Sequence, residues 1–138
     1  MNRKLIELVS RLKGNPPATE EAILDFERSA GLNLPPDYRA FLRQADGAEG
    51  FVGEGGYVIL WPVEKLLEWN EAYEVEEYAP GLVLFGSSGG GEAYAFDSRE
   101  GQMDVVAVPF VGMDLSEVAR ISMTFAEFLE ALSEGTKP

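Results

Sequence analysis

The chain has 138 residues and a formal net charge of −13, and it contains neither cysteine nor histidine. The two missing residue types exclude Ser-His-Asp and Cys-His nucleophiles, zinc sites with thiolate or imidazole ligands, haem held by His or Cys, and iron–sulfur clusters. The excess of carboxylates disfavours a nucleic-acid partner, because such binding depends on Lys and Arg that neutralise phosphates. We therefore expect no metal, no cofactor and a basic protein as partner; an acidic surface that serves solubility alone is the alternative.

Length and hydropathy predict a single domain, 1–138, in the cytoplasm. A chain of this size can bury roughly 68–70% of the surface that its unfolded form exposes, so disulfides and metals are not needed for stability. No apolar run approaches the roughly 20 residues of a membrane helix. Glu7 and Arg11 also interrupt the first apolar run before it could form a signal-peptide core, so we expect no membrane association.

Helical spacing and terminal residues predict three helices in the first third of the chain. Apolar residues recur at helical spacing within 1–15, which gives the first helix one inward face. Thr19 suits the N-cap of a second helix, which ends at Gly31, where a left-handed cap favours glycine. Pro36 lies in the first turn of a third helix, which ends before Gly47.

The middle of the chain predicts mixed structure. Residues 47–56 are rich in Gly and Glu and predict an exposed loop or a short edge strand. The β-branched and aromatic residues 57–61 predict a strand. A helix over about 63–73 follows and is expected to bury Leu66 and Leu67.

The stretch Leu82–Asp97 organises the predicted sheet. A short apolar run at its start and alternation with period two at its end predict two strands, joined by a Gly- and Ser-rich loop over 86–91. We expect this hairpin in the middle of the sheet. A further strand over 105–108 and an extended loop over 110–120 follow it.

The last helix has the clearest start signal. Thr124 to Glu127 fit a capping box, and Met123 with Phe128 fits its hydrophobic staple. The tail 133–138 is expected to fray. Taken together, these elements predict a soluble α+β domain.

Glutamates crowd the interval between residues 49 and 77, where Lys65 alone opposes them. Clustered carboxylates repel one another in the folded state, but they steer a basic partner towards the surface that carries them. The alternative is that these glutamates lie on a solvent-exposed helix face that binds no partner. The candidate partner-binding residues in this interval are Glu49, Glu54, Glu64, Glu68, Glu71, Glu74, Glu76 and Glu77.

The glycine-rich loop gives a second candidate contact. Glycines let backbone N–H groups approach a phosphate, but no Lys-Ser/Thr follows them and the next element is a predicted strand, so a phosphate loop is not favoured. Glu92 and Asp97 fall on opposite faces of one strand and could not flank a glycosidic bond, so we expect no catalytic residue and no enzyme. We retain the loop as a contact edge, with the candidates Ser87, Ser88, Gly89, Gly90 and Gly91.

Motifs along nearly the whole chain occur in a recognisable order. The first third carries Glu21-Ala22-Ile23, Phe26-Glu27, Gly31 to Tyr38, and Phe41-Leu42. The middle carries Trp61-Pro62, Leu66, Asn70, Phe85-Gly86, Gly90-Gly91-Glu92 and Tyr94 to Asp97, and the end carries Ser122 to Leu132. This series resembles the SUKH superfamily, in its Smi/Knr-type branch.

The resemblance implies an α+β fold with a central, mostly antiparallel sheet and helices packed around it. For bacterial members it implies immunity proteins, which bind a cognate toxin, often a nuclease, and neutralise it by occlusion. Yeast members regulate cell-wall assembly through protein contacts. A regulatory or scaffold domain that binds a host protein or a small ligand, without a toxin, is therefore the alternative.

Replacement of Thr124 by Ala is expected to lower the free energy of unfolding by about 1 kcal/mol, because the hydroxyl caps the last helix. Chemical denaturation measures the change. An unchanged denaturation midpoint would show that the hydroxyl does not act as a cap.

Overall fold

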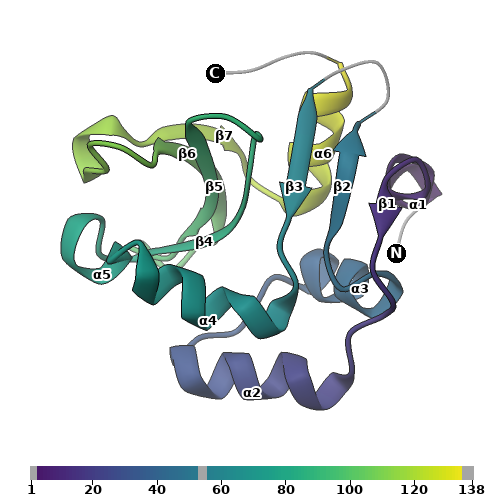
Figure 1. Ribbon diagram of the computed structural model, residues 1–138, viewed down its shortest axis with the longest axis horizontal. Coiled ribbons are helices and arrows are strands. Elements are labelled where there is room, and N and C mark those ends of the chain that lie inside the picture. The colour runs from purple at the N-terminus through teal and green to yellow at the C-terminus, as the bar shows by residue number, and fades with distance from the viewer. Residues whose placement is uncertain (1–2, 53–55, 135–138) are drawn as a thin grey trace.

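The computed structural model describes residues 3–52 and 56–134. Its centre is a sheet of seven strands that lie in chain order and pair antiparallel throughout (Figure 1). This confirms the α+β class with a central antiparallel sheet. The strands are β1 (Lys13–Gly14), β2 (Ala48–Phe51), β3 (Tyr57–Leu60), β4 (Leu82–Ser87), β5 (Glu92–Asp97), β6 (Asp104–Pro109) and β7 (Ala119–Ser122). The helices are α1 (Arg3–Ser10), α2 (Glu20–Ala30), α3 (Pro36–Gln44), α4 (Val63–Ala72), α5 (Val75–Tyr78) and α6 (Phe125–Ser133), with a 3-10 turn η1 (Leu115–Glu117).

The end signals of the second and third helices are confirmed. Thr19 Oγ1 accepts a hydrogen bond from the N–H of Ala22 at 3.1 Å and caps α2. Gly31 follows α2 with a φ of 71°, in the left-handed region that favours glycine. Pro36 occupies the first turn of α3, as its fixed φ and missing N–H allow.

The expected first helix, within 1–15, is too long. α1 ends at Ser10, and the pair Lys13–Gly14 joins the sheet as its edge strand β1. β2 therefore lies between β1 and β3, and is neither the loop nor the edge strand expected over 47–56. A strand as short as β1 has no side-chain pattern of its own, because the backbone of its neighbour defines it.

The predicted hairpin, β4 and β5, occupies the middle of the sheet, and its aromatic face forms the core. Phe85 and Phe96 stack with their ring centroids 4.4 Å apart. The ring centroid of Tyr38, on α3, lies 5.0 Å from that of Phe96. The ring centroid of Phe128, on α6, lies 4.7 Å from that of Tyr94. Large rings meeting in tilted and edge-to-face pairs fix α3 and α6 against this face of the sheet.

A gap opens in the sheet between β3 and β4. The two strands pair only at Ile59 with Ser87 and at Leu60 with Gly86. Gly86 permits this approach, because a Cβ at its position would lie 2.4 Å from the carbonyl oxygen of Ile59. Beyond this point β3 leaves its neighbour and the chain turns into α4.

The side chain of Asn70, on α4, fills the place of the missing strand. Its Oδ1 accepts from the N–H of Leu84 at 2.8 Å, and its Nδ2 donates to the carbonyl oxygen of Leu84 at 3.0 Å. The same Nδ2 donates to the carbonyl oxygen of Leu66 at 2.7 Å. One amide thus satisfies both backbone groups of a buried strand residue and joins α4 to the sheet.

The end of the chain departs from expectation in three places. Residues 110–120, expected to form an extended loop, contain η1 and the start of the edge strand β7. Met123 is 60% exposed, so the predicted staple with Phe128 is wrong. The frayed tail was predicted from residue 133, but Ser133 belongs to α6, and 135–138 lie outside the described residues.

The caps of α6 come from two elements. Thr124 Oγ1 accepts from the N–H of Glu127 at 3.1 Å, which confirms the cap. Glu127 accepts in return from the N–H of Met123, not of Thr124, at 3.3 Å. Asp37 of α3 accepts from the N–H of Ala126 at 2.9 Å, a cap that no local sequence signal indicates.

Asn70→Ala is expected to lower the free energy of unfolding by about 1–3 kcal/mol, because it leaves the N–H of buried Leu84 without a partner. Asn70→Asp keeps the acceptor but loses both donors, and is also expected to be destabilised. Asn33→Ala, at an exposed position, is the control and should change stability by less than about 0.5 kcal/mol. Equal unfolding midpoints for Asn70→Ala and the control would contradict this role.

Candidate functional site

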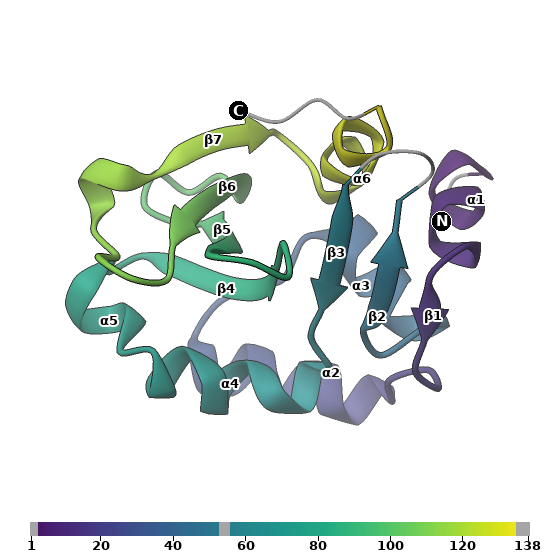
Figure 2. The ribbon, with the colours of Figure 1, turned by 45° about the horizontal axis from the view of Figure 1, so that its top comes forward.

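The structure divides the predicted contact residues between two surfaces. Six glutamates lie on α4, on α5 and in the turn between them, whereas Glu49 and the β4–β5 turn lie together on the other side of α4. Glu54 falls outside the described residues. Figure 2 shows α2, α4 and α5 along one edge of the molecule, with α1 at the far end.

Two adjoining hollows lie between α2 and the α4–α5 segment. Their volumes are about 630 and 240 Å³, and they share Phe26, Ser29 and Leu67 in their linings. We call the two hollows together the acidic trough. Its carboxylates are Asp25, Glu64, Glu71, Glu74, Glu76 and Glu77. Its apolar floor consists of Phe26, Leu32, Leu67, Leu82 and Val83.

The periodicity of α4 places both charge and apolar surface in the trough. Glu64 and Glu71, two helical turns apart, lie on one side of α4, with Leu67 between them. Leu66 is buried as expected, but Leu67 is 40% exposed, so its predicted burial is wrong. The helix turns only its Val63 and Leu66 stripe fully inward, which leaves Leu67 at the rim of the core.

The turn between α4 and α5 adds three carboxylates to one end of the trough. Glu74 has a φ of 53°, and its carbonyl oxygen accepts from the N–H groups of Glu77 and Tyr78, both at 3.1 Å. Val75 is buried beneath this turn. The left-handed residue therefore begins α5 while Glu74, Glu76 and Glu77 remain exposed beside the floor.

No Lys or Arg lies among the described lining residues of the trough. Lys65 instead lies 3.9 Å from Glu68, at exposed positions outside the trough, so Glu68 does not join the other glutamates. Asp25 pairs with Arg28 on α2. The trough therefore has uncompensated negative charge along its α4–α5 side and a neutralised pair on its α2 side.

A third hollow, which we call the aromatic groove, lies on β2 and β3. It is on the face of these strands that no described helix covers (Figure 1). Its volume is about 460 Å³, and its lining includes Glu49, Tyr57, Ile59, Trp61 and Trp69. The Tyr57 hydroxyl donates to the Glu49 carboxylate, which raises the pKa of Tyr57. Lys13 lies in the same lining, so the groove contains both signs of charge.

The β4–β5 turn lies beside this groove. A Cβ at Gly89 would lie 3.1 Å from the ring of Tyr57. Ser87, however, is only 7% exposed, and its Oγ accepts from the N–H of Gly89 at 3.2 Å. Ser87 thus holds the turn and is not a surface contact, whereas Gly89, Gly90 and Gly91 are exposed.

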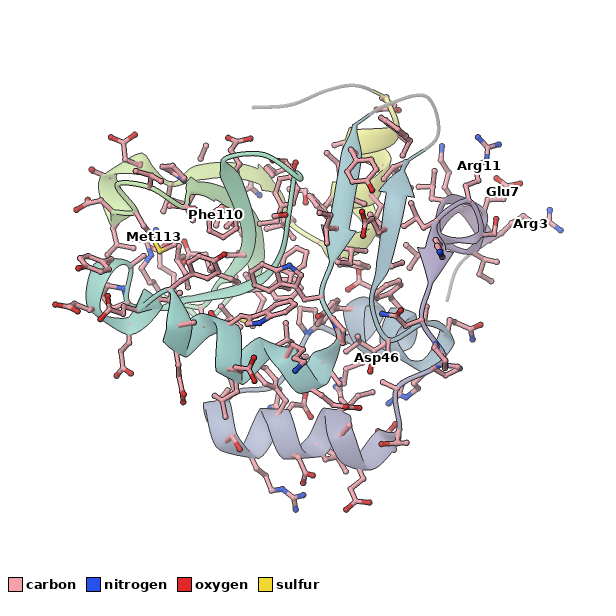
Figure 3. The ribbon with its side chains drawn as sticks, in the orientation of Figure 1. Arg3, Glu7, Arg11, Asp46, Phe110 and Met113 are labelled. Carbon is pink, nitrogen blue, oxygen red and sulfur yellow. The ribbon has the colours of Figure 1, made fainter. Side chains whose placement is uncertain are left out.

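Aromatic rings fill the space between α4 and the sheet. Trp61 is buried, with its ring centroid 4.8 Å from that of Trp69. Tyr73 lies 4.7 Å from Phe110 by the same measure. Figure 3 shows Phe110 and Met113 between the curved sheet and the α4–α5 segment. Because these rings hold α4 on the sheet, one helix can present Trp69 to the groove and Glu71 to the trough.

Asp46 fixes the start of α4 from outside the helix. Pro62 precedes α4 and offers no side-chain acceptor, but Asp46 Oδ1 accepts from the N–H of Val63 at 2.7 Å (Figure 3). Burial raises the pKa of the Asp46 carboxyl, the hydrogen bond from Val63 opposes this, and nearby Glu64 adds to the rise. The sequence indicated Asp46 only as the end of α3, because its partner is 17 residues away.

Within 3–52 and 56–134, no three Asp or Glu side chains are placed to hold a metal ion. Across the same ranges, every helix is too short or too polar to cross a membrane.

Asp46→Asn should change how stability depends on pH. Because the pKa of Asp46 is raised on folding, the folded state holds its proton to higher pH, so the contribution of Asp46 to stability falls as pH rises from the ordinary Asp range through the raised pKa. Asn keeps an acceptor for Val63 and lacks this titration. The unfolding free energy of wild type minus that of Asp46→Asn should decrease across this window in urea titrations, and a constant difference would contradict the assignment.

Comparison with known proteins places the chain in a family. The model of the SMI1/KNR4 family (SUKH-1) matches residues 17–131, from the loop before α2 into α6. An uncharacterized protein, YnaB of Bacillus subtilis (strain 168), is 35% identical over 83 residues, which are 60% of this chain and 48% of that protein. The match thus spans about half the length of this curated relative. Since the family model covers most of the chain, including the helices and strands that form the trough, the chain belongs to the SMI1/KNR4 (SUKH-1) family.

Proposed function

We propose that this protein is a non-enzymatic protein-binding domain, and that it acts as an immunity protein that neutralises a basic toxin by occluding it. The acidic trough is the observation that supports this proposal, because it combines uncompensated carboxylates with an open apolar floor. Membership of the SUKH-1 family is consistent with such a role. A nuclease would suit the trough, since enzymes that bind nucleic acid carry basic surfaces.

The distribution of charge favours association with a basic partner in one orientation. Figure 3 shows Arg3 and Arg11 projecting from α1, at the opposite end of the molecule from α5. The carboxylates of α4 and α5 lie at the other end. A basic protein would therefore be drawn to the trough and turned away from α1 during approach.

The aromatic groove favours a second candidate, a regulatory or scaffold domain. Its volume of about 460 Å³ lies in the range typical of small-ligand pockets, and its lining mixes aromatic rings with a few polar groups. A host protein or small ligand held there would need no toxin.

Affinity capture from the native host, at low and moderate salt, tests the two roles. Immunity predicts recovery of a basic protein that arrests growth when produced alone and is harmless when produced with this chain. Recovery of host regulatory proteins only, with no growth arrest, would support the regulatory role. Recovery of no protein would contradict both protein-binding roles.

Glu71→Lys/Glu76→Lys should slow association with the captured partner by on the order of tenfold, because it reverses charge in the trough. Glu100→Lys/Glu117→Lys, at exposed positions outside the trough, makes the same change in net charge and is the control. At each salt concentration of a series, the association rate measured by surface plasmon resonance should be reduced more, relative to wild type, for the trough variant than for the control. Equal rates for the two variants would show that net charge alone governs association.

A further inference from the structure

We infer that the acidic trough receives an amphipathic α-helix of its partner, with apolar side chains on the floor and Lys or Arg along the α4–α5 side. This inference rests on the proposed function, in which a basic protein binds at the trough. It adds the secondary structure and the side-chain pattern of the segment that is bound.

The floor of the trough is apolar and open. It is built by α2, by the residues that follow α2, by α4 and by β4, which contribute Phe26, Leu32, Leu67 and Val83. Leu67 is 40% exposed, and Leu32 and Val83 are half-buried. Phe26 is buried, but Leu67, Leu32 and Val83 keep part of their apolar surface exposed, so a partner that covered them would remove that surface from water.

The length of the trough matches that of a short α-helix. Glu64 and Glu71 are seven residues apart on α4, which corresponds to roughly 10 Å along the helix axis. The trough continues past the end of α4 to Glu74 and Glu77. A helix of three to four turns, on the order of 16–22 Å, would lie along it beside α2 and α4.

The backbone around the trough disfavours an extended peptide. A bound strand needs free N–H and C=O groups at a sheet edge. β4 borders the trough at Leu82 and Val83, where the N–H of Leu82 is bonded to the carbonyl oxygen of Ala79. Both backbone groups of the adjoining Leu84 are bonded to Asn70. Most of the remaining lining comes from α2, α4 and α5, helices whose backbone groups bond internally. A helix needs no such edge, because its own backbone is satisfied.

The charges of the trough indicate which side of the bound helix carries Lys or Arg. The trough carboxylates without an ion pair among the described residues lie on the α4–α5 side, at Glu64, Glu71, Glu74, Glu76 and Glu77. On the α2 side, Asp25 is already paired with Arg28. We therefore expect cations at helical spacing along one flank only, next to an apolar stripe.

A designed peptide tests this geometry directly. The probe is a labelled Leu/Lys peptide of roughly 14 residues, about four helical turns, with Leu at i, i+3, i+4 and i+7. A scrambled peptide of the same composition carries the same charge without the stripe. Fluorescence anisotropy should show the ordered peptide binding at least tenfold more tightly than the scrambled one, and circular dichroism should show that it gains helix on binding.

Matched variants test whether the peptide binds in the trough. Leu67→Ser, on the floor, should weaken binding about tenfold, whereas Val111→Ser, at a residue that is 92% exposed elsewhere, should not. Glu71→Lys/Glu76→Lys should weaken binding, and Glu100→Lys/Glu117→Lys should do so much less. Thermal melts confirm that each variant remains folded, and the same four variants are then compared against the captured partner.

The outcomes separate this inference from the proposed function. Equal affinities for the ordered and scrambled peptides, or equal effects of Leu67→Ser and Val111→Ser, would overturn the helix inference, while capture of a basic partner would still support the proposed function. Failure to capture any basic protein from the host would overturn the proposed function itself, whatever the peptides do.

Discussion

The hydrogen bonds between the side chain of Asn70 and the backbone of Leu84 bridge the gap that opens in the sheet between β3 and β4. β3 leaves β4 after two residue pairs, and without a substitute the buried edge of β4 would have unpaired backbone groups. The amide that fills this place belongs to α4. The sheet can therefore open and admit a helix without losing backbone hydrogen bonds, and the position of α4 becomes part of the fold's own stability.

The orientation of α4 follows from contacts at both its ends. Asp46 binds its first N–H group, and the rings of Trp61, Trp69, Tyr73 and Phe110 pack between it and the sheet. Held in this way, the helix separates two surfaces of different chemistry. The acidic trough on one side has an uncompensated charge, whereas the aromatic groove on the other side has mixed charge and more ring surface.

This arrangement connects the acidity of the chain to a defined place. A net charge of −13 spread evenly would serve solubility, but six of the 24 carboxylates lie around one apolar floor, while Arg3 and Arg11 project from the opposite end. Attraction at long range and burial of apolar surface at short range then act at the same location. That combination is what a domain needs to bind a basic protein in one orientation.

The sequence alone determined the features that depend on near neighbours. Thr19, Gly31 and Thr124 were predicted as caps because a cap acts within about four residues, and the hairpin Leu82–Asp97 was predicted because its alternation and its turn are local. Tertiary structure decided the rest. β1 exists because β2 offers it a backbone, Leu67 is exposed because of how α4 is turned, and the glutamates predicted as one surface lie on two. The trough itself joins α2 to α4 and α5, roughly 40 residues apart in the chain, and no local pattern can indicate which distant helices will meet.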